Sequence, residues 1–165
     1  MITIIKNVLT TKERKQLIKD SKPLLFTGEE LEERFHHKFP PSKQTLSLLH
    51  TNANFKSLIV KMLDRINDEI GLSFGTDNVW VNWNSGKKNE MAWHSHPSPY
   101  TCVYYMKTVL FLNSGTQFKH KFVRAPQNSL MLFPGDIDHT VPSYPFHFIE
   151  RYTLAMDLNI NRCME

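Results

Sequence analysis

The chain has 165 residues, a length that suits one ordinary domain and is too short for two comfortable ones. Apolar residues make up 41% of the sequence and charged residues 22%, which excludes extensive disorder and is typical of a folded globular protein. The 20 basic and 16 acidic residues are interspersed along the chain. The net charge of +4 therefore does not indicate a nucleic-acid-binding face, and we do not expect a nucleic-acid partner.

The sequence carries no sign of a membrane or secreted protein. It has no stretch close to the about 18 uninterrupted apolar residues that a membrane helix needs, and the charge at Lys6 does not fit a signal peptide. Its two cysteines, Cys102 and Cys163, do not make a disulfide framework, which favours a reducing compartment. We expect a cytoplasmic location, in the host cytoplasm if the protein is viral, and no membrane partner.

The first 75 residues predict a helical region that follows one short strand. The spacing of Thr10 and Glu13 is that of a capping box, in which the two residues exchange hydrogen bonds at a helix start. Apolar side chains recur at helical spacing after Asn54, and Gly71 stands where a left-handed helix cap is expected. The predicted elements are a strand over 2–5 and helices over 11–20, 29–35 and 54–70.

The rest of the chain predicts strands. It is rich in β-branched and aromatic residues, and clusters of Asn, Ser, Gly and Pro interrupt it at turn-like intervals. The predicted strands cover 79–84, 101–112, 117–124, 129–133 and 146–158. We therefore expect an α+β fold that is mainly β, a sandwich or barrel with N-terminal helices buttressing one sheet. With no repeat or linker, the prediction is a single domain over 1–165, helical to about 75 and β from about 76 to 160.

Three histidines suggest a metal site. His94 and His96 lie two residues apart, so on an extended chain both imidazoles point to the same side. His139 follows a predicted strand that ends in Pro134-Gly135, which can present it from a second segment. Three ligands on one face of a metal leave other positions open, as a non-haem iron that binds both substrate and O₂ requires.

Two aspartates beside His139 are alternative third ligands. Asp136 or Asp138 could supply a carboxylate in place of His96. Asp138 is adjacent to His139 and would point the opposite way on a strand, so we rank it below His96.

Arg151 is the second candidate functional residue. It shares a strand face with Thr153, and an arginine inside a sandwich is costly to bury unless it is paired. A planar guanidinium beside a hydroxyl suits the two oxygens of a ligand carboxylate. The alternative is a structural ion pair with Glu150 or Asp157.

Five motifs follow one another in the second half of the chain. They are Val81-Asn82-Trp83-Asn84, His94-x-His96-Pro97, Val103-Tyr104-Tyr105, Leu132-Phe133-Pro134 with His139, and Arg151-x-Thr153. In this order they resemble the Fe(II)/2-oxoglutarate-dependent oxygenase superfamily, and look closest to small prolyl-hydroxylase-like oxygenases of phages and marine bacteria. The resemblance covers about residues 78–159. The sequence departs from the pattern at His96, where most members have Asp or Glu, and at Gly135, where similar proteins often have Ser.

The resemblance implies a fold, a metal and a cosubstrate. The fold would be a double-stranded β-helix, a cupin-like jelly roll, with an iron at its mouth. His94, His96 and His139 would bind Fe(II), and 2-oxoglutarate would chelate that iron beside O₂. Arg151 would pair with the distal carboxylate of 2-oxoglutarate, with Thr153 as its hydroxyl partner.

Two further positions would line the cosubstrate pocket by the same resemblance. Tyr105 or Tyr104 would donate a hydrogen bond to 2-oxoglutarate, and Asn84 or Asn82 would lie beside it. One member of each pair is expected to face the core instead. We expect Tyr105 and Asn84 to face the pocket.

The implied function is that of a 2-oxoglutarate-dependent dioxygenase, a hydroxylase. Such an enzyme oxidises 2-oxoglutarate to succinate and CO₂ while it hydroxylates a C–H bond, here of a prolyl or other peptide side chain or of a small molecule. The alternative is a cupin-like metal-binding protein or a non-catalytic jelly-roll accessory protein. A cupin-like protein would not need Arg151 on the last strand, and an accessory protein would keep the fold and lose the metal.

Overall fold

The computed structural model describes residues 1–36, 38–39, 42–85, 91–141 and 149–161. The helices are α1 (Thr11–Ser21), α2 (Gly28–Phe35), α3 (Ala53–Ile70) and the 3-10 turns η1 (Lys22–Leu24) and η2 (Leu49–Thr51). The strands are β1 (Thr3–Lys6), β2 (Lys43–Gln44), β3 (Phe74–Ser85), β4 (Tyr100–Lys107), β5 (Thr116–Phe118), β6 (Lys121–Val123), β7 (Ser129–Pro134), β8 (His139–Thr140) and β9 (Glu150–Ile160).

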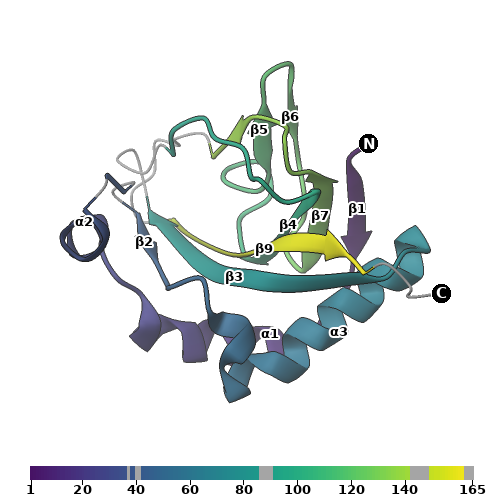
Figure 1. Cartoon of the computed structure of the whole chain (residues 1–165), viewed down its shortest axis with the longest axis horizontal. Helices are drawn as coiled ribbons and strands as arrows, with labels where there is room; N and C mark the ends of the chain where they lie inside the picture. The colour runs from purple at the N-terminus through teal and green to yellow at the C-terminus, as the bar shows by residue number, and fades with distance from the viewer. Residues whose placement is uncertain (37, 40–41, 86–90, 142–148, 162–165) are drawn as a thin grey trace.

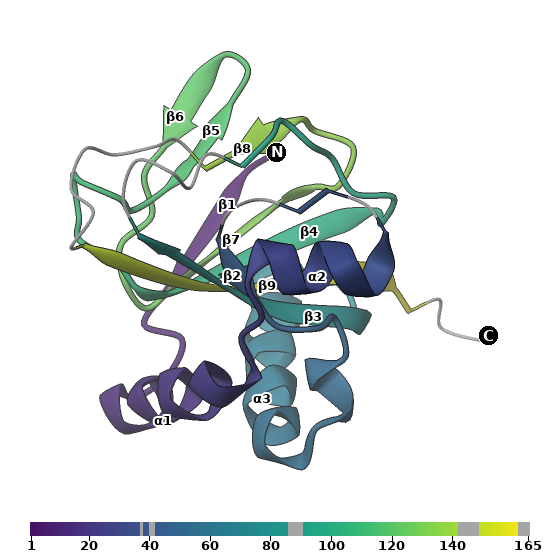
Figure 2. The same ribbon diagram turned by 90° about the vertical axis from the view of Figure 1, so that its left-hand side faces the viewer.

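The strands form two antiparallel sheets. Among the described residues, a six-stranded sheet has the order β1-β7-β4-β9-β3-β2, and a three-stranded sheet has the order β6-β5-β8. Helices α1 and α3 lie against one face of the large sheet, and the hairpin of β5 and β6 lies beyond the other face (Figures 1 and 2). The prediction of a mainly β fold with N-terminal helices on one sheet is confirmed.

The side chains of β9 point alternately to the two faces of the large sheet. Its even-numbered residues from Tyr152 to Leu158 are buried in the core on the helical side. The apolar stripe of α3 packs into the same core and ends at Gly71, which has the expected left-handed conformation (φ 73°). The odd-numbered residues of β9 from Arg151 to Asp157 are buried on the opposite face.

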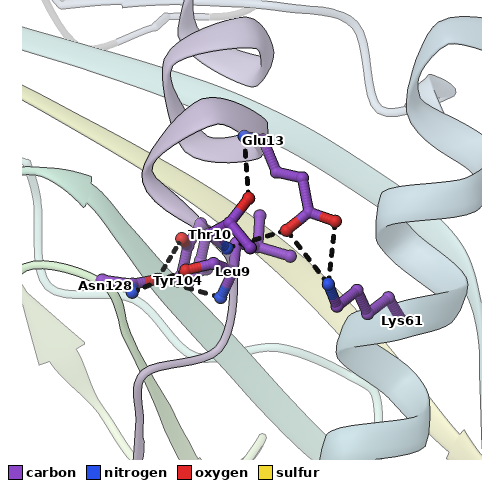
Figure 3. A network of polar contacts seen from close by, with 6 residues as sticks. All are labelled: Leu9, Thr10, Glu13, Lys61, Tyr104 and Asn128. Carbon is purple, nitrogen blue, oxygen red and sulfur yellow. Dashed lines mark hydrogen bonds and ion pairs between the residues drawn. The ribbon is translucent and has the colours of Figure 1, made fainter.

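Polar contacts link the start of α1 to both the sheet and α3 (Figure 3). Thr10 and Glu13 form the predicted capping box, and the Glu13 carboxylate also lies 2.8 Å from Nζ of Lys61 on α3. Asn128 holds the preceding residue, because its side chain bonds to both the N–H and the carbonyl of Leu9. The Tyr104 hydroxyl donates to the same Asn128 oxygen at 2.7 Å, which links this segment to β4.

The Glu13→Gln variant is expected to lose stability at neutral pH only. Hydrogen bonds from Lys61 and Thr10 lower the pKa of Glu13 from 4.5 to about 2. A depressed pKa stabilises the fold above the unfolded value of 4.5, and this contribution is lost as pH falls toward 2. Because the pair is partly exposed, we expect the free energy of unfolding to fall by about 1 kcal/mol at pH 7.

Urea denaturation at pH 7 and at pH 2–3 measures this difference. The control is Glu33→Gln, which changes an exposed glutamate of α2. A destabilisation by Glu13→Gln that is equally large at both pH values would contradict the electrostatic origin.

Two predicted strands are wrong in part. The strand predicted over 101–112 ends at Lys107, because the Asn113 side chain accepts a hydrogen bond from Val109 N–H and closes a turn. Phe111 in this turn has a positive φ of 74°, which lies outside the β region of backbone angles. The strand predicted over 117–124 is the hairpin of β5 and β6.

Other differences are smaller. The last strand begins at Glu150, and the predicted positions 146–148 lie outside the described residues. The two-residue strands β2 and β8 and both 3-10 turns were not predicted, because such short elements carry no periodicity. Cys102 is a buried free thiol, and Cys163 lies outside the described residues. None of the described helices is both long and apolar enough to cross a membrane.

Candidate metal and cosubstrate site

One face of the large sheet gathers polar residues from three adjacent strands. Residues that pair directly across antiparallel strands point to the same face. Arg151 of β9 pairs with Asn84 of β3, and Thr153 pairs with both Asn82 of β3 and Tyr105 of β4. All five side chains are buried, on the face opposite α1 and α3. The face defined by these residues is called the polar face below.

The expected division of the asparagines is wrong. Asn82 and Asn84 are two residues apart on β3, so both lie on the polar face and neither faces the helical core. The tyrosines do divide as expected. Tyr105 lies on the polar face, and Tyr104 points into the opposite core, where it contacts Asn128.

Arg151 is the largest of the fully buried side chains among the described residues, with 1% of its surface exposed. Its Nε donates to the carbonyl of Asn113 at 3.1 Å, and NH2 donates to the carbonyl of Gly115 at 3.2 Å. Its NH1 lies 3.4 Å from both Asn84 Oδ1 and Thr153 Oγ1. The guanidinium is thus held in one plane and one direction by the turn before β5 and by its neighbours on the sheet.

The alternative partners of Arg151 are engaged elsewhere. The Glu150 carboxylate pairs with Lys107 Nζ at 2.6 Å, and the Asp157 carboxylate lies 3.0 Å from Nδ1 of His96. The structure therefore does not show the ion pair that we considered between Arg151 and either residue. The Tyr105 ring lies under the guanidinium, 5.4 Å away, and the Tyr105 hydroxyl is 2.6 Å from Thr116 Oγ1.

The three predicted histidines come together. His94 and His96 lie in the segment before β4, and His139 begins β8. Two backbone hydrogen bonds join them, from His94 N–H to the His139 carbonyl at 3.1 Å and back at 2.9 Å. Each histidine offers a ligand atom, and these three atoms lie within 4.8 Å of one another. Among the described residues this is the one cluster that could hold a metal ion.

The hydrogen bonds of the three imidazoles leave one nitrogen of each available. Nδ1 of His94 lies 2.8 Å from the Ala92 carbonyl, and Nδ1 of His139 lies 2.9 Å from the Ile137 carbonyl. Nδ1 of His96 faces the Asp157 carboxylate. Because all three acceptors require a proton on Nδ1, the lone pair of every Nε2 remains for a metal.

Burial keeps two of these imidazoles neutral. It lowers the pKa of His94, and it lowers the pKa of His139 to about 4. Neutral imidazole is the form that binds a metal. The Phe133 ring lies 4.8 Å from the His139 ring and covers it from the large sheet.

The two aspartates considered as ligands are not in the cluster. The Asp138 carboxylate points to the surface, where it pairs with Lys119 Nζ at 2.6 Å. Asp136 is exposed. The structure therefore brings together the three histidines and neither of these carboxylates.

Sequence reasoning missed the contact between Asp157 and His96. Asp157 entered only as a partner for Arg151. Its place six residues after Arg151 on one strand puts it on the same face, which was a usable signal. What the sequence did not indicate is that the 96–99 loop folds back over this end of β9.

Gly135 allows this loop to approach β7. The Gly135 carbonyl accepts a hydrogen bond from His96 N–H at 2.7 Å, and Gly135 N–H donates to the Pro99 carbonyl at 3.1 Å. A Cβ at this position would overlap the carbonyl oxygen of Ser98 and lie 3.1 Å from that of His96. The departure from serine at this position therefore has a steric reason in this chain.

The Gly135→Ala variant is expected to lose about 2 kcal/mol of stability, because the added methyl pushes the loop off β7. Nickel affinity should fall as well, since the same loop carries His96. Thermal unfolding and nickel titration measure the two effects. The control is Gly75→Ala, where the close neighbour is only the side-chain end of Asn161. Unchanged stability of Gly135→Ala would contradict the close approach.

The polar face contains buried polar atoms that fit a polar ligand. Among the described residues, Asn82 Oδ1 and Thr101 Oγ1 are buried and have no hydrogen-bond partner. Thr101 pairs with Asp157 on β9, near the histidines, and Asn82 pairs with Thr153, near Arg151. A buried polar atom left unpaired is costly. Both atoms lie on the stretch of sheet between the imidazoles and the guanidinium, where an elongated dicarboxylate would lie.

A groove of about 600 Å³ opens at the histidine end of this face. Trp80, His96 and Asp157 line its inner end, and Arg34 and Phe35 of α2 line its outer end. The segment around β2 forms one wall. The groove gives a ligand direct access to His96.

Comparison with known proteins identifies the fold. No family model and no curated protein matches the sequence. Solved structures that are similar over nearly the whole chain include the following three. A viral collagen prolyl hydroxylase from Paramecium bursaria Chlorella virus-1, solved with 2-oxoglutarate, has a TM-score of 0.67 and 11% identity, and the match covers 95% of this chain and 94% of that one. The chain shares the fold of 2-oxoglutarate-dependent oxygenases.

Two other similar structures come from different organisms. A prolyl hydroxylase from Trichoplax adhaerens, in complex with a peptide fragment of hypoxia-inducible factor, has a TM-score of 0.66 and 14% identity, with 96% of this chain and 83% of that one covered. HygX from Streptomyces hygroscopicus, with nickel, 2-oxoglutarate and hygromycin B, has a TM-score of 0.71 and 10% identity, with coverages of 96% and 82%. The resemblance predicted from the motifs is thus confirmed for the oxygenase fold.

Proposed function

We propose that this protein is a non-haem Fe(II)- and 2-oxoglutarate-dependent dioxygenase that hydroxylates its substrate. The observation that carries the proposal is that three metal-competent imidazoles and a buried arginine lie at two ends of one polar face. The oxygenase fold, shared with proteins solved with 2-oxoglutarate, supports it. When bound, the iron and 2-oxoglutarate would supply the oxidation, in which 2-oxoglutarate, O₂ and a C–H bond give succinate, CO₂ and an alcohol.

Each site residue has a part in this proposal. His94, His96 and His139 would hold the iron through Nε2. Arg151 would bind the distal carboxylate of 2-oxoglutarate through its planar fork, beside Thr153 and Asn84. Tyr105 supports the guanidinium from below, and Asn82 and Thr101 would bond to the cosubstrate between the two ends.

The fold has a specific form in this proposal. Residues 1–165 would act as one oxygenase domain in which the two sheets make a double-stranded β-helix. The helical part, to about residue 75, would buttress the large sheet, and the site would lie between the sheets. The support is the position of His139 on the small sheet, opposite a large sheet that carries Arg151.

The substrate would enter through the groove between α2 and His96. Its aromatic and apolar walls exclude water from part of a bound molecule, while Arg34 offers a charge at the outer end. A peptide or a small molecule fits a groove of this kind. The similar structures hold one of each, a hypoxia-inducible factor peptide in one and hygromycin B in the other.

Anaerobic spectroscopy and product analysis test the proposal. Adding Fe(II) and 2-oxoglutarate to the folded protein without O₂ should produce a weak visible charge-transfer band, and admitting O₂ should produce succinate. A folded protein that gives neither would overturn the proposed function.

Metal binding with and without 2-oxoglutarate separates the enzyme from its alternatives. Metal binding that 2-oxoglutarate does not strengthen would favour a cupin-like protein, and no metal binding would favour a non-catalytic jelly roll. The buried Arg151 supports the enzyme, because neither alternative needs a guanidinium on this face.

A further inference from the structure

We propose that Asp157 is a positioning residue of the metal centre, which orients His96 and supplies through it the negative charge that three neutral imidazoles lack. This inference rests on the proposed function, because it assumes that the histidines hold a metal. It concerns a residue outside the ligand set and explains how a histidine can stand where related oxygenases place a carboxylate.

The first observation is the contact itself. The Asp157 carboxylate lies 3.0 Å from Nδ1 of His96, and the two side chains are only 9% and 11% exposed. A charged hydrogen bond at this burial is screened little by water. His94 and His139 direct Nδ1 to neutral backbone carbonyls instead. Among the three imidazoles, His96 is thus the one whose outer nitrogen faces a charge.

The second observation is that both partners are held in place. Ser98 Oγ lies 3.2 Å from the Asp157 carboxylate and 2.9 Å from the Tyr100 carbonyl, and Thr76 Oγ1 donates to the Asp157 backbone carbonyl at 2.7 Å. The Trp80 ring stacks on His96, with ring centres 5.6 Å apart and planes at 29°. The imidazole therefore lies between an aromatic wall and a carboxylate, which fixes its rotation.

The chemistry follows from this geometry. A carboxylate that accepts the Nδ1 proton makes the opposite nitrogen, Nε2, a better electron-pair donor. It also places one negative charge a single residue away from the metal. In the common arrangement of two histidines and one carboxylate, this charge belongs to a ligand. In this chain it would reach the metal through His96.

The test compares nickel binding by two conservative variants. Asp157→Asn keeps the size of the side chain and an oxygen that accepts from Nδ1, but it removes the charge. We expect its dissociation constant for Ni(II), measured by calorimetry without 2-oxoglutarate, to rise about 10- to 100-fold. The matched control is Asp138→Asn, which removes an exposed carboxylate beside His139 and should change the constant less than about threefold.

A second pair of variants separates the electronic role from a purely structural one. In the His96→Asp background no imidazole is left for Asp157 to act through. We expect Asp157→Asn to weaken Ni(II) binding by less than about threefold in this background, against about 10- to 100-fold in the parent. A purely structural role would weaken binding equally in both backgrounds, because the loss of packing does not depend on the imidazole.

The outcomes are distinct. Parent-like nickel affinity in Asp157→Asn overturns the inference, and so does an equally large loss of affinity when Asp157→Asn is made in the His96→Asp background. Absence of nickel binding by the parent overturns the proposed metal centre together with this inference. If nickel binds and the variants behave as expected but succinate never forms, the positioning role of Asp157 stands and the enzyme function fails.

Discussion

The His94→Ala variant is expected to lose Ni(II) and Fe(II) binding almost completely while keeping its fold. Two remaining imidazoles do not complete one face of a metal. A hydrogen-bond partner of a metal ligand is itself worth about 10- to 100-fold in affinity, so removing a ligand should cost more than about a hundredfold. The backbone hydrogen bonds between residues 94 and 139 do not involve the imidazole and should survive the substitution. Metal content after loading and gel filtration measures the effect.

His120→Ala is the matched control for this variant. His120 is exposed in the turn between β5 and β6, outside the cluster. The His120→Ala variant should bind as much metal as the parent protein. If His94→Ala retains an equal amount of tightly bound metal, the three histidines are not the metal centre.

The Arg151→Lys variant should fail in a different way. Lysine keeps the charge but loses the planar fork, which at this site is aligned by the carbonyls of Asn113 and Gly115. A charge-assisted hydrogen bond is worth about 1.5–3 kcal/mol, so losing one implies about a ten- to hundredfold weaker affinity for 2-oxoglutarate. Iron or nickel content should stay normal, because Arg151 contacts none of the three histidines in the structure. Titrating 2-oxoglutarate into the nickel-loaded protein measures the change.

Arg124→Lys makes the same exchange on the surface, where the guanidinium lies over the rings of Phe111 and Phe122. This control should bind 2-oxoglutarate like the parent. If Arg151→Lys does so too, Arg151 does not bind the cosubstrate. Thermal unfolding of both variants separates a loss of affinity from a loss of fold.

Long, periodic elements were predicted well from the sequence because their patterns depend on interactions between residues that are close together in the chain. The apolar stripe of α3 and the capping box of α1 are both local, and both lie where expected. The predicted strand over 101–112 failed because residues 108–112 are as apolar as a strand, while a single side chain, Asn113, closes them into a turn. An apolar run does not distinguish a strand from an exposed apolar turn.

The alternation of side chains along a strand predicted much of the site. The prediction for the two asparagines was wrong because the alternation was applied to them incorrectly. Counting by twos along β9 placed Arg151 and Thr153 together, and the same count on β4 separated Tyr105 from Tyr104. Applied to Asn82 and Asn84, it should have placed both on one face. The contact between Asp157 and His96 depends on how a loop closes over a strand end. No periodicity along the chain encodes such a closure.

The place of β9 in the large sheet links the site to the course of folding. This strand comes last among the described elements, yet it lies between β4 and β3 in the middle of the sheet. Its Arg151 meets a residue 67 positions earlier, and contacts so distant in sequence form slowly because a long loop must close first. A chain whose first eight strands have formed therefore still has a gap where both Arg151 and Asp157 belong. Tight binding of the metal and the cosubstrate would then begin only late in folding. The appearance of both binding activities during refolding would show that β9 has entered the sheet.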